Sequence, residues 1–402
     1  MGPSRFAHVA LLAASLALHA APLFAQTADD LFDPGTIQEV RLFVNRSDLR
    51  TLEETYTENT YYTADLQWRG QRVRNVGIRS RGGASRSPAK PGLEIAFDHY
   101  VGGQRFVGQL ALVLDNLWQD PSMVRERVAM AFFSRMGQPA PRESFCRLYI
   151  NDVLYGLYAI VEAVTPDFLA RTTGNDNGYL FEYKYTRPYY FDDLGEELDR
   201  YREIFEARSH RLEPDAVLYG PLRDFVREVN HADDPVWRGR VEAHVDLAQF
   251  VTYVAIEAFL AEPDGILGVI GMANFYLARN GATGPHRLIP WDKDLAFSDT
   301  LSPIFARAEE NVLFRRTMSF PDLRALYLDV LEACARAAMA DDWLRAEVAW
   351  SRSLIADDAG ADTRKPYSND DLTAAGDYLD EFAAGRPGYV LAEVARARDQ
   401  AE

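Results

Sequence analysis

Asp264, Asn274, Asp292 and Asp294 lie close together in the sequence and offer a set of oxygen ligands. Carboxylate and amide oxygens suit Mg²⁺ or Mn²⁺, which prefer hard ligands and retain a few waters. The spacing therefore predicts a divalent-cation site formed by Asn274, Asp292 and Asp294. Asp264 is not needed for that site, which leaves its carboxylate free to act as a base.

The residues around this set have the pattern of a β-hairpin. Residues 273–277 and 288–291 are mostly apolar, and the turn-forming sequences Asn-Gly and Thr-Gly-Pro lie between them. In such a hairpin the first strand starts near Asn274, beside the end of the second strand, which leads into Asp292 and Asp294. We therefore expect the amide and the two carboxylates to converge.

A simpler interpretation competes with the metal site, because pairs of aspartates near a turn are usually solvated. Trp291 and Phe297 flank the pair in this sequence. Aromatic neighbours favour partial burial, where an unpaired carboxylate is costly, so they shift the balance toward a bound cation.

A second polar segment, residues 79–86, has the sequence RSRGGASR. Backbone N–H groups and guanidinium groups both suit phosphate. The two glycines, the hydroxyls (including that of Ser85) and the arginines (including Arg79 and Arg81) predict a phosphate-binding loop. Most glycine-rich and serine-rich stretches are ordinary loops, so this segment alone is a weak indication.

Glu126 lies in a segment, residues 122–136, that is expected to be a helix with Ser122 as its cap. From the first turns of that helix, Glu126 is placed to pair with a lysine or arginine from the preceding sheet. The competing interpretation, with even odds, is a simple surface carboxylate.

The hydrophobic pattern changes along the chain from a period of two to a helical period. Strands are expected at residues 38–45, 61–68, 72–81, 93–97, 145–151, 155–162 and 179–184. Helices are expected at residues 215–230, 235–245, 247–262, 320–339, 341–356 and 376–384. The sequence thus predicts an α+β protein with a sheet-rich first part, a mostly helical second part and a cleft where they meet.

Composition and charge exclude several classes of partner. The chain of 402 residues carries a formal net charge of −17, which argues against nucleic acid and anionic membranes. Residues 1–25 have the pattern of a signal peptide, with an apolar run too short to span a membrane comfortably. No second apolar run of spanning length follows, so we expect an exported protein, periplasmic or extracellular, without a transmembrane segment after signal removal.

The remaining residue types exclude other chemistry. Two cysteines, Cys146 and Cys334, are too few for a cysteine-based zinc site. Export permits a disulfide between them, and two buried free thiols are an equally good interpretation. No Gly-x-Ser-x-Gly sequence follows a strand, which argues against a serine hydrolase.

Several motifs, in order, resemble the CotH kinase family, the spore-coat-H type of atypical protein kinase. They are IRSRGGAS at 78–85 with Lys90 downstream, DPSMVRE at 120–126, GQPAPR at 137–142, LYIN at 148–151 followed by GLY at 156–158 and Glu162, and IPWDKDLAF at 289–297. Each motif is weak alone, and the ordered set is fairly specific. Together they cover roughly residues 38–300.

The resemblance implies a bilobal protein-kinase-like fold, with a β-rich N-lobe at 26–165 and a mostly helical C-lobe at 166–402. It implies that Asp264 is the catalytic aspartate and that Asn274, Asp292 and Asp294 bind Mg²⁺ or Mn²⁺. The resemblance also implies that Arg79, Arg81, Ser85 and Lys90 contact the phosphates of ATP. Glu126 would orient one of these basic side chains, and Glu162 would lie at the hinge beside adenine.

The function implied is an exported kinase that transfers the γ-phosphate of ATP to serine or threonine of an unidentified protein substrate. Two alternatives stay open. An Asp-x-Asp sequence after a strand also holds the metal in many nucleotide-sugar transferases. An exported relative with an altered catalytic loop is also compatible with a non-catalytic surface-binding module or pseudokinase. The sequence predicts no oligomeric state.

Overall fold

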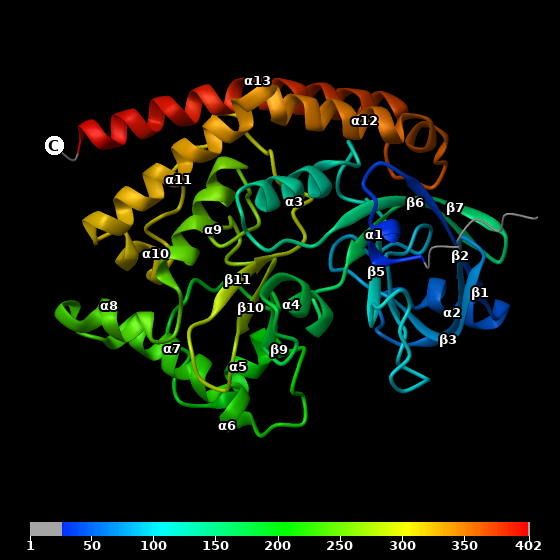
Figure 1. Cartoon of the computed structure of the whole chain (residues 1–402), viewed down its shortest axis with the longest axis horizontal. Helices are drawn as coiled ribbons and strands as arrows, with labels where there is room; N and C mark the ends of the chain where they lie inside the picture. The colour runs from blue at the N-terminus through cyan, green and yellow to red at the C-terminus, as the bar shows by residue number, and fades with distance from the viewer. Residues whose placement is uncertain (1–25, 401–402) are drawn as a thin grey trace, which may run out of the picture.

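The computed structural model describes residues 26–400, so the expected signal peptide at 1–25 lies outside the described residues. Its first part is a closed seven-stranded barrel with the strand order β1-β2-β3-β4-β5-β7-β6 (Figure 1). The strands are β1 Ile37–Val44, β2 Tyr62–Trp68, β3 Gln71–Ser80, β4 Leu93–Ala96, β5 Ala111–Asp115, β6 Glu143–Ile150 and β7 Val153–Glu162. All neighbours are antiparallel except β1 and β6, whose parallel pairing closes the barrel.

Alternation of side chains along the strands fills the barrel with its own core. In β1, for example, Val40, Leu42 and Val44 are buried and point to one side. The turn between β6 and β7 places both Asn151 and Asp152 at positive φ, 50° and 64°. Asn and Asp tolerate this conformation, which a two-residue hairpin requires, so local turn chemistry fixes the register here.

The second part combines a four-stranded sheet, in the order β11-β10-β8-β9, with most of the helices. Its strands are β8 Tyr179–Tyr183, β9 Phe205–Ala207, β10 Phe275–Arg279 and β11 Arg287–Pro290. The helices are α4 Pro166–Thr173, α5 Leu198–Ile204, α6 Asp215–Leu218, α7 Gly220–His231, α8 Asp234–Glu242, α9 Leu247–Phe259, α10 Val312–Thr317, α11 Pro321–Met339, η1 Ala340–Asp342, α12 Trp343–Ala361 and α13 Asn369–Asp399. Before this part come α1 Ala28–Leu31, α2 Arg46–Glu54 and α3 Arg125–Arg135.

The last two helices, α12 and α13, extend along the top of the molecule in Figure 1, from the helical part to the barrel. On the barrel side, Asp362 at the end of α12 forms a buried ion pair with Lys90. On the helical side, the guanidinium of Arg386 donates hydrogen bonds to the Ala258 and Phe259 carbonyls at the end of α9. These contacts join the two parts outside the strands themselves.

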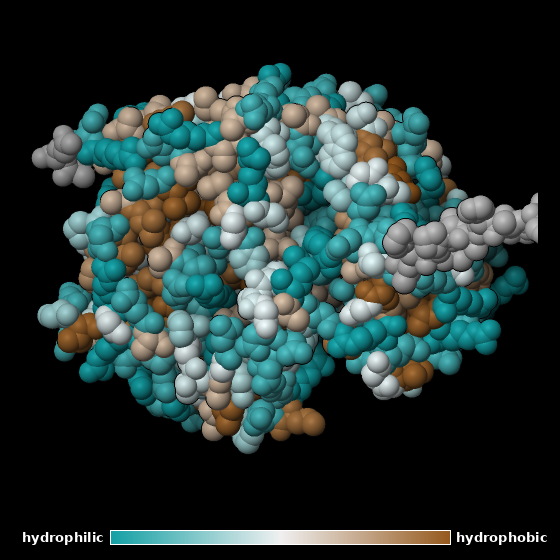
Figure 2. All heavy atoms as spheres, in the orientation of Figure 1, coloured by the Kyte–Doolittle hydropathy of each residue, from teal (hydrophilic) through white to brown (hydrophobic). Residues whose placement is uncertain are grey.

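The two cysteines are free and lie in different cores, Cys146 inside the barrel and Cys334 in the helical part. The structure therefore supports buried thiols and not a disulfide. Hydrophilic residues cover most of the face seen in Figure 2, as expected for an acidic protein. Within residues 26–400, the helices are all too short or too polar to cross a membrane.

The expected strands are confirmed within one or two residues, and most helices are confirmed with shifted ends. The helix expected at 122–136 begins at Arg125, and Ser122 does not cap it. Asp120 takes that role, because its carboxylate accepts hydrogen bonds from the backbone N–H groups of Val124 and Arg125, each at 2.8 Å. Strands β5 and β9 and helices α1, α2, α5 and α10 were not predicted, and α13 is much longer than residues 376–384.

Candidate functional site

A cavity of about 1150 Å³ lies between the barrel and the second sheet. Strands β3, β4 and β5 and the loop 82–86 line one side of it, and β8, β9 and the open end of the β10–β11 hairpin line the other. The chain that leaves β7, residues 163–166, forms part of the wall between these sides.

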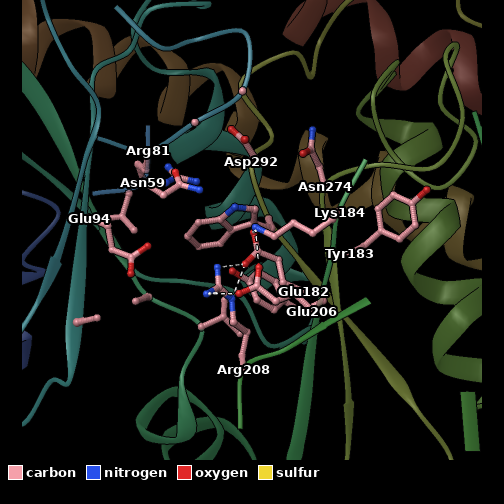
Figure 3. Close-up of a pocket in the computed structure, with 18 of the residues that line it drawn as sticks. Asn59, Arg81, Glu94, Glu182, Tyr183, Lys184, Glu206, Arg208, Asn274 and Asp292 are labelled. Carbon is pink, nitrogen blue, oxygen red and sulfur yellow. Dashed lines mark hydrogen bonds and ion pairs between the residues drawn. The ribbon is translucent and has the colours of Figure 1, made fainter. Parts of the chain in front are cut away.

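The hairpin register brings Asn274 and Asp292 to the same end of the cavity. Phe275 pairs with Pro290, so the residues just outside this pair are neighbours at the open end of the hairpin. Asn274 and Asp292 have positive φ values of 59° and 53°, a conformation that Asn and Asp tolerate better than most residues. Both side chains point into the cavity in Figure 3, with Arg81 beside Asp292.

Asp264 contacts the hairpin directly, because the Asn274 side-chain Nδ2 donates a hydrogen bond to Asp264 Oδ2 at 2.9 Å. That bond does not use the amide oxygen of Asn274. Asp264 lines the cavity, and its second carboxylate oxygen, Oδ1, is buried without a hydrogen-bond partner. Burial raises the pKa of Asp264, and nearby Lys293 opposes that rise.

Arg81 is the basic side chain of the site that is best suited to bind phosphate. Its Nη1 lies 3.5 Å from Asp115 Oδ2, a loose contact, and its guanidinium lies 5.2 Å from the centroid of the Trp291 ring. Burial lowers the pKa of Arg81, but Asp292 and Asp115 together raise it above its ordinary value. The side chain is therefore a charged donor at the end of the cavity that holds the acids.

At the end of the cavity near Asp292, carboxylate side chains outnumber the basic side chains. Burial raises the pKa of Asp292 to about 6, against the opposing effect of Arg81. Burial, together with Asp292 and Asp115, raises the pKa of Asp294 well above its usual range. Carboxylates that raise one another's pKa in this way mark a place where a bound cation restores the ionised forms.

The residues present fit a magnesium or manganese ion that is shared with a phosphate ligand. Within residues 26–400 no group of three His, Cys, Asp or Glu side chains is arranged to hold a metal by itself. Mg²⁺ usually binds through one or two carboxylates, substrate phosphates and waters, so Asp292, Asp294 and the Asn274 oxygen are a sufficient protein contribution. The unpaired Asp264 Oδ1 in the same wall is a further unused acceptor.

Comparison with known proteins identifies the family of this chain. The profile of the family described as CotH kinase protein matches residues 78–390, most of the chain. This chain belongs to the CotH kinase protein family. The inner spore coat protein H of Bacillus subtilis (strain 168) is 23% identical over 316 residues, which cover 77% of this chain and 84% of that protein.

Two solved structures share part of the outline. One is the HipA–HipB toxin–antitoxin complex with operator DNA from Shewanella oneidensis MR-1, with 12% identity, a TM-score of 0.35 and coverage of 72% of this chain and 60% of that one. The other is the proinflammatory kinase CtkA of Helicobacter pylori, with 9% identity, a TM-score of 0.35 and coverage of 77% and 95%. At this level of similarity we base no conclusion on either.

In this CotH family member, seven of the residues expected at the site line the cavity. They are Arg79, Arg81, Ser85, Asp264, Asn274, Asp292 and Asp294. Arg79 is already engaged, however, because Glu94 and Asn59 both accept hydrogen bonds from its guanidinium. The Glu94 carboxylate neutralises this charge, so Arg79 is a weaker candidate for phosphate binding than Arg81.

The expected role of Lys90 at the phosphates does not fit the structure. Its side chain is fully buried outside the cavity lining, and its Nζ lies 2.7 Å from Asp362 Oδ2. The expected role of Glu126 also fails. This carboxyl is buried with no ion pair to Lys or Arg among the described residues, and burial together with Glu143 raises its pKa well above the usual range.

Glu162 itself lies outside the cavity lining, at the edge of the segment expected beside the base. Ala163, Val164 and the next two residues line the cavity, but the Glu162 carboxylate is buried elsewhere, between Arg142 at 2.8 Å and Arg171 at 2.5 Å. The charged partners come from segments outside the barrel strands, and no local pattern indicates that pairing.

Sequence reasoning missed a cluster of charged side chains at β8 and β9, formed by Glu182, Lys184, Glu206 and Arg208. Glu182 accepts hydrogen bonds from Lys184 Nζ at 2.8 Å and from Arg208 Nε at 2.6 Å, and Lys184 also pairs with Glu206. Figure 3 shows these side chains grouped at the side of the cavity away from Asp292. Strand β9 has only three residues, too few for a recognisable period, so no local pattern predicted this cluster.

Proposed function

We propose that this CotH family member is a metal-dependent protein kinase that transfers the γ-phosphate of ATP to serine or threonine hydroxyls of a protein. One observation carries the proposal. Asp264, hydrogen-bonded to Asn274, shares a cavity wall with Asp292, Asp294 and the Arg81 guanidinium, and the glycine loop 82–83 borders the same space. A base, oxygen ligands for a cation and a phosphate-binding cation are the parts that phosphoryl transfer needs.

In this mechanism each side chain has a distinct role. Asn274, Asp292 and Asp294 would hold Mg²⁺ or Mn²⁺, which would supply positive charge at the phosphates. The Asp264 carboxylate accepts the hydrogen bond of the incoming hydroxyl and takes its proton, for which its raised pKa is suited. Arg81 stabilises the charge that develops on the transferred group, because it donates from a buried position.

The proposal extends to the architecture and the location. The barrel and the helical part would act as N-lobe, 26–165, and C-lobe, 166–402, with the nucleotide between them and residues 163–166 beside the base. The named relative is an inner spore coat protein, which supports a surface or extracytoplasmic location for this chain too. The signal-like sequence at 1–25 points the same way.

The first test is a transfer assay with the purified chain, labelled ATP, Mg²⁺ or Mn²⁺ and a generic protein acceptor. Asp264→Asn keeps the shape of the base and removes its basicity, so turnover should fall by about 10²- to 10⁴-fold. Asp292→Ala should abolish metal-dependent turnover while circular dichroism and the melting temperature show an intact fold. Wild-type activity in Asp292→Ala would reject the metal assignment.

The alternatives are separated by ligand binding. Thermal shift with Mg–ATP and with sugar nucleotides reports which ligand stabilises the fold. Stabilisation by Mg–ATP without any transfer would replace the proposal with a pseudokinase or binding module. Stabilisation only by sugar nucleotides would replace it with a glycosyltransferase.

A further inference from the structure

Lys293 separates the two proposed metal ligands in the sequence but lies on the other side of the chain from the cavity. Asp292 and Asp294 line the cavity, whereas Lys293 is fully buried and does not. Its Nζ lies 2.7 Å from Glu257 Oε1 and donates a hydrogen bond to the backbone carbonyl of Asn274 at 2.9 Å. The Lys293 ammonium group therefore connects the end of β11, the start of β10 and helix α9.

Glu257 is the α9 end of this link, and it also holds the loop that carries Asp264. Its other oxygen, Oε2, accepts a hydrogen bond from the backbone N–H of Ile266 at 2.8 Å. Gly265 permits this approach, since a Cβ at that position would lie 2.5 Å from the Glu257 carboxylate. The loop backbone thus lies directly against the carboxylate that Lys293 pairs with.

The same network reaches Asp264 from two further directions. The backbone N–H of Asp264 donates to Glu262 Oε1 at 2.8 Å, and the Asn274 amide donates to its side chain at 2.9 Å. Asn274 is in turn fixed through its carbonyl by Lys293. Glu257 and Lys293 thus hold the Asp264 loop at Ile266 and Asn274, while Asn311 and Arg307 hold other carbonyls of the same loop.

We propose that Lys293 and Glu257 are positioning residues, whose ion pair fixes Asp264 and Asn274 relative to Asp292. The inference rests on the proposed function for its kinetic consequence, but its structural consequence is independent of turnover. Neither side chain lines the cavity, so neither touches substrate or metal. Lys293 acts through the backbone of Asn274, and Glu257 acts through the backbone of Ile266, two residues after Asp264.

A second buried pair in the same chain provides a matched control. Lys90 and Asp362 also lie 2.7 Å apart and are also fully buried. That pair joins α12 to the barrel and, among the described residues, makes no hydrogen bond or ion pair with Asp264, Asn274 or Asp292. Glu257→Gln and Asp362→Asn make the same change, an amide for a carboxylate, and each leaves a buried lysine without its counter-charge.

The kinetic experiment compares Lys293→Met, Lys293→Arg, Glu257→Gln and Asp362→Asn in the full chain, with activity expressed per folded molecule. Residues that orient metal ligands typically change activity or metal affinity by about 10- to 100-fold. Lys293→Met and Glu257→Gln should lower kcat by that amount and leave KM for ATP within about threefold. Lys293→Arg, which keeps the charge, should recover part of the loss, and Asp362→Asn should lower the melting temperature while its kcat stays within about twofold.

Two readouts do not depend on turnover. Mn²⁺ binding, followed by the electron paramagnetic resonance of the free ion, should weaken by about tenfold or more in Lys293→Met and Glu257→Gln but not in Asp362→Asn. Amide hydrogen exchange of residues 264–274 should accelerate in the same two variants and not in the control. The double variant Lys293→Met/Glu257→Gln removes both charges of this ion pair, so it tests the link even if a single variant folds poorly.

The outcomes separate the two proposals. A wild-type chain that binds Mn²⁺ and shows no transfer overturns the kinase assignment, and the exchange and binding data still decide the role of Lys293. Unchanged Mn²⁺ affinity and unchanged exchange in the double variant overturn the positioning role. An equal loss of kcat per folded molecule in Asp362→Asn overturns it as well, because the effect would then follow from any buried ion pair.

Discussion

At the scale of single residues, the most unusual group is the Glu143 carboxyl in the barrel strand β6. Both of its oxygens are buried without a hydrogen-bond partner. Burial raises the pKa of Glu143 to about 8, Arg127 opposes the rise, and Asp115 and Asp292 add to it. Burial and nearby carboxylates also raise the pKa of its neighbour Glu126. The two glutamates therefore hold protons that free glutamates lose.

This predicts a pH dependence of stability that Glu143→Gln should reduce. Between the ordinary pKa near 4.5 and the folded value of about 8, the folded chain binds more protons than the unfolded chain. The free energy of unfolding therefore falls as pH rises through that window, by at most about 1.4 kcal/mol per pH unit for one group. Chemical denaturation at pH 5 to 9 should show a shallower slope in Glu143→Gln and a more stable variant at pH 8.

The control for this experiment is Glu39→Gln on β1, whose side chain is half exposed. It removes one glutamate from the same barrel and should keep the wild-type slope. An identical slope in Glu143→Gln and the wild type would mean that Glu143 is ionised in the folded protein.

At the scale of elements, the end of helix α12 docks into strand β7 at Gly156. The Asp362 carboxylate accepts hydrogen bonds from the Leu157 backbone N–H at 3.0 Å and from Lys90 Nζ at 2.7 Å. Gly156 has a φ of 123°, and a Cβ there would lie 2.4 Å from Asp362. A strand interior usually disfavours glycine, so this position trades strand propensity for a contact between a helix and the barrel.

Gly156→Ala should therefore destabilise the protein. The new Cβ enters the space of the Asp362 carboxylate, in a backbone conformation that L residues rarely adopt, and it separates the carboxylate from Lys90. Breaking a buried ion pair costs about 3–5 kcal/mol, so we expect a loss of that order in urea unfolding.

Gly239→Ala in helix α8 is the matched control, because a Cβ there meets nothing within 4 Å. An alanine inside an exposed helix should stabilise it by about 0.5–1 kcal/mol. If Gly156→Ala were as stable as Gly239→Ala, α12 would not depend on the close approach at β7.

At the scale of the whole molecule, the candidate site belongs to neither part alone. Arg81 and the loop 82–86 come from the barrel side, whereas Asp264 and Asn274 come from the helical part. Helices α12 and α13 run above α3 and α9 in Figure 1, where α12 contacts β7 of the barrel and α13 contacts α9. A ligand in the cavity should therefore act on both parts together.

Mg–ATP should raise the melting temperature of a single transition and slow amide exchange on both sides of the cavity. Ligand at 100 times its Kd adds about 2.7 kcal/mol of stability if it binds only the folded state. We expect protection at residues 79–86 and at 264–274 together, measured by hydrogen exchange and mass spectrometry. Protection on one side only would place the nucleotide elsewhere than between the two parts.

Much of this architecture follows from local sequence. Alternation along the strands, the Asn151-Asp152 turn and the apolar segments around Asn274 each act over a few residues, so the hairpin and the approach of Asn274 to Asp292 are readable without a fold. The motifs that resemble the CotH family were readable for the same reason.

The partners of the charged residues were decided by tertiary structure alone. Lys90 pairs with Asp362, 272 residues away, and Glu162 pairs with two arginines outside the barrel strands, so neither side chain lines the cavity as expected. A buried charge must find a counter-charge wherever the fold brings one near, because leaving it unpaired costs several kcal/mol, about as much as a domain's whole stability. That choice depends on which elements pack together, and local sequence carries no record of it.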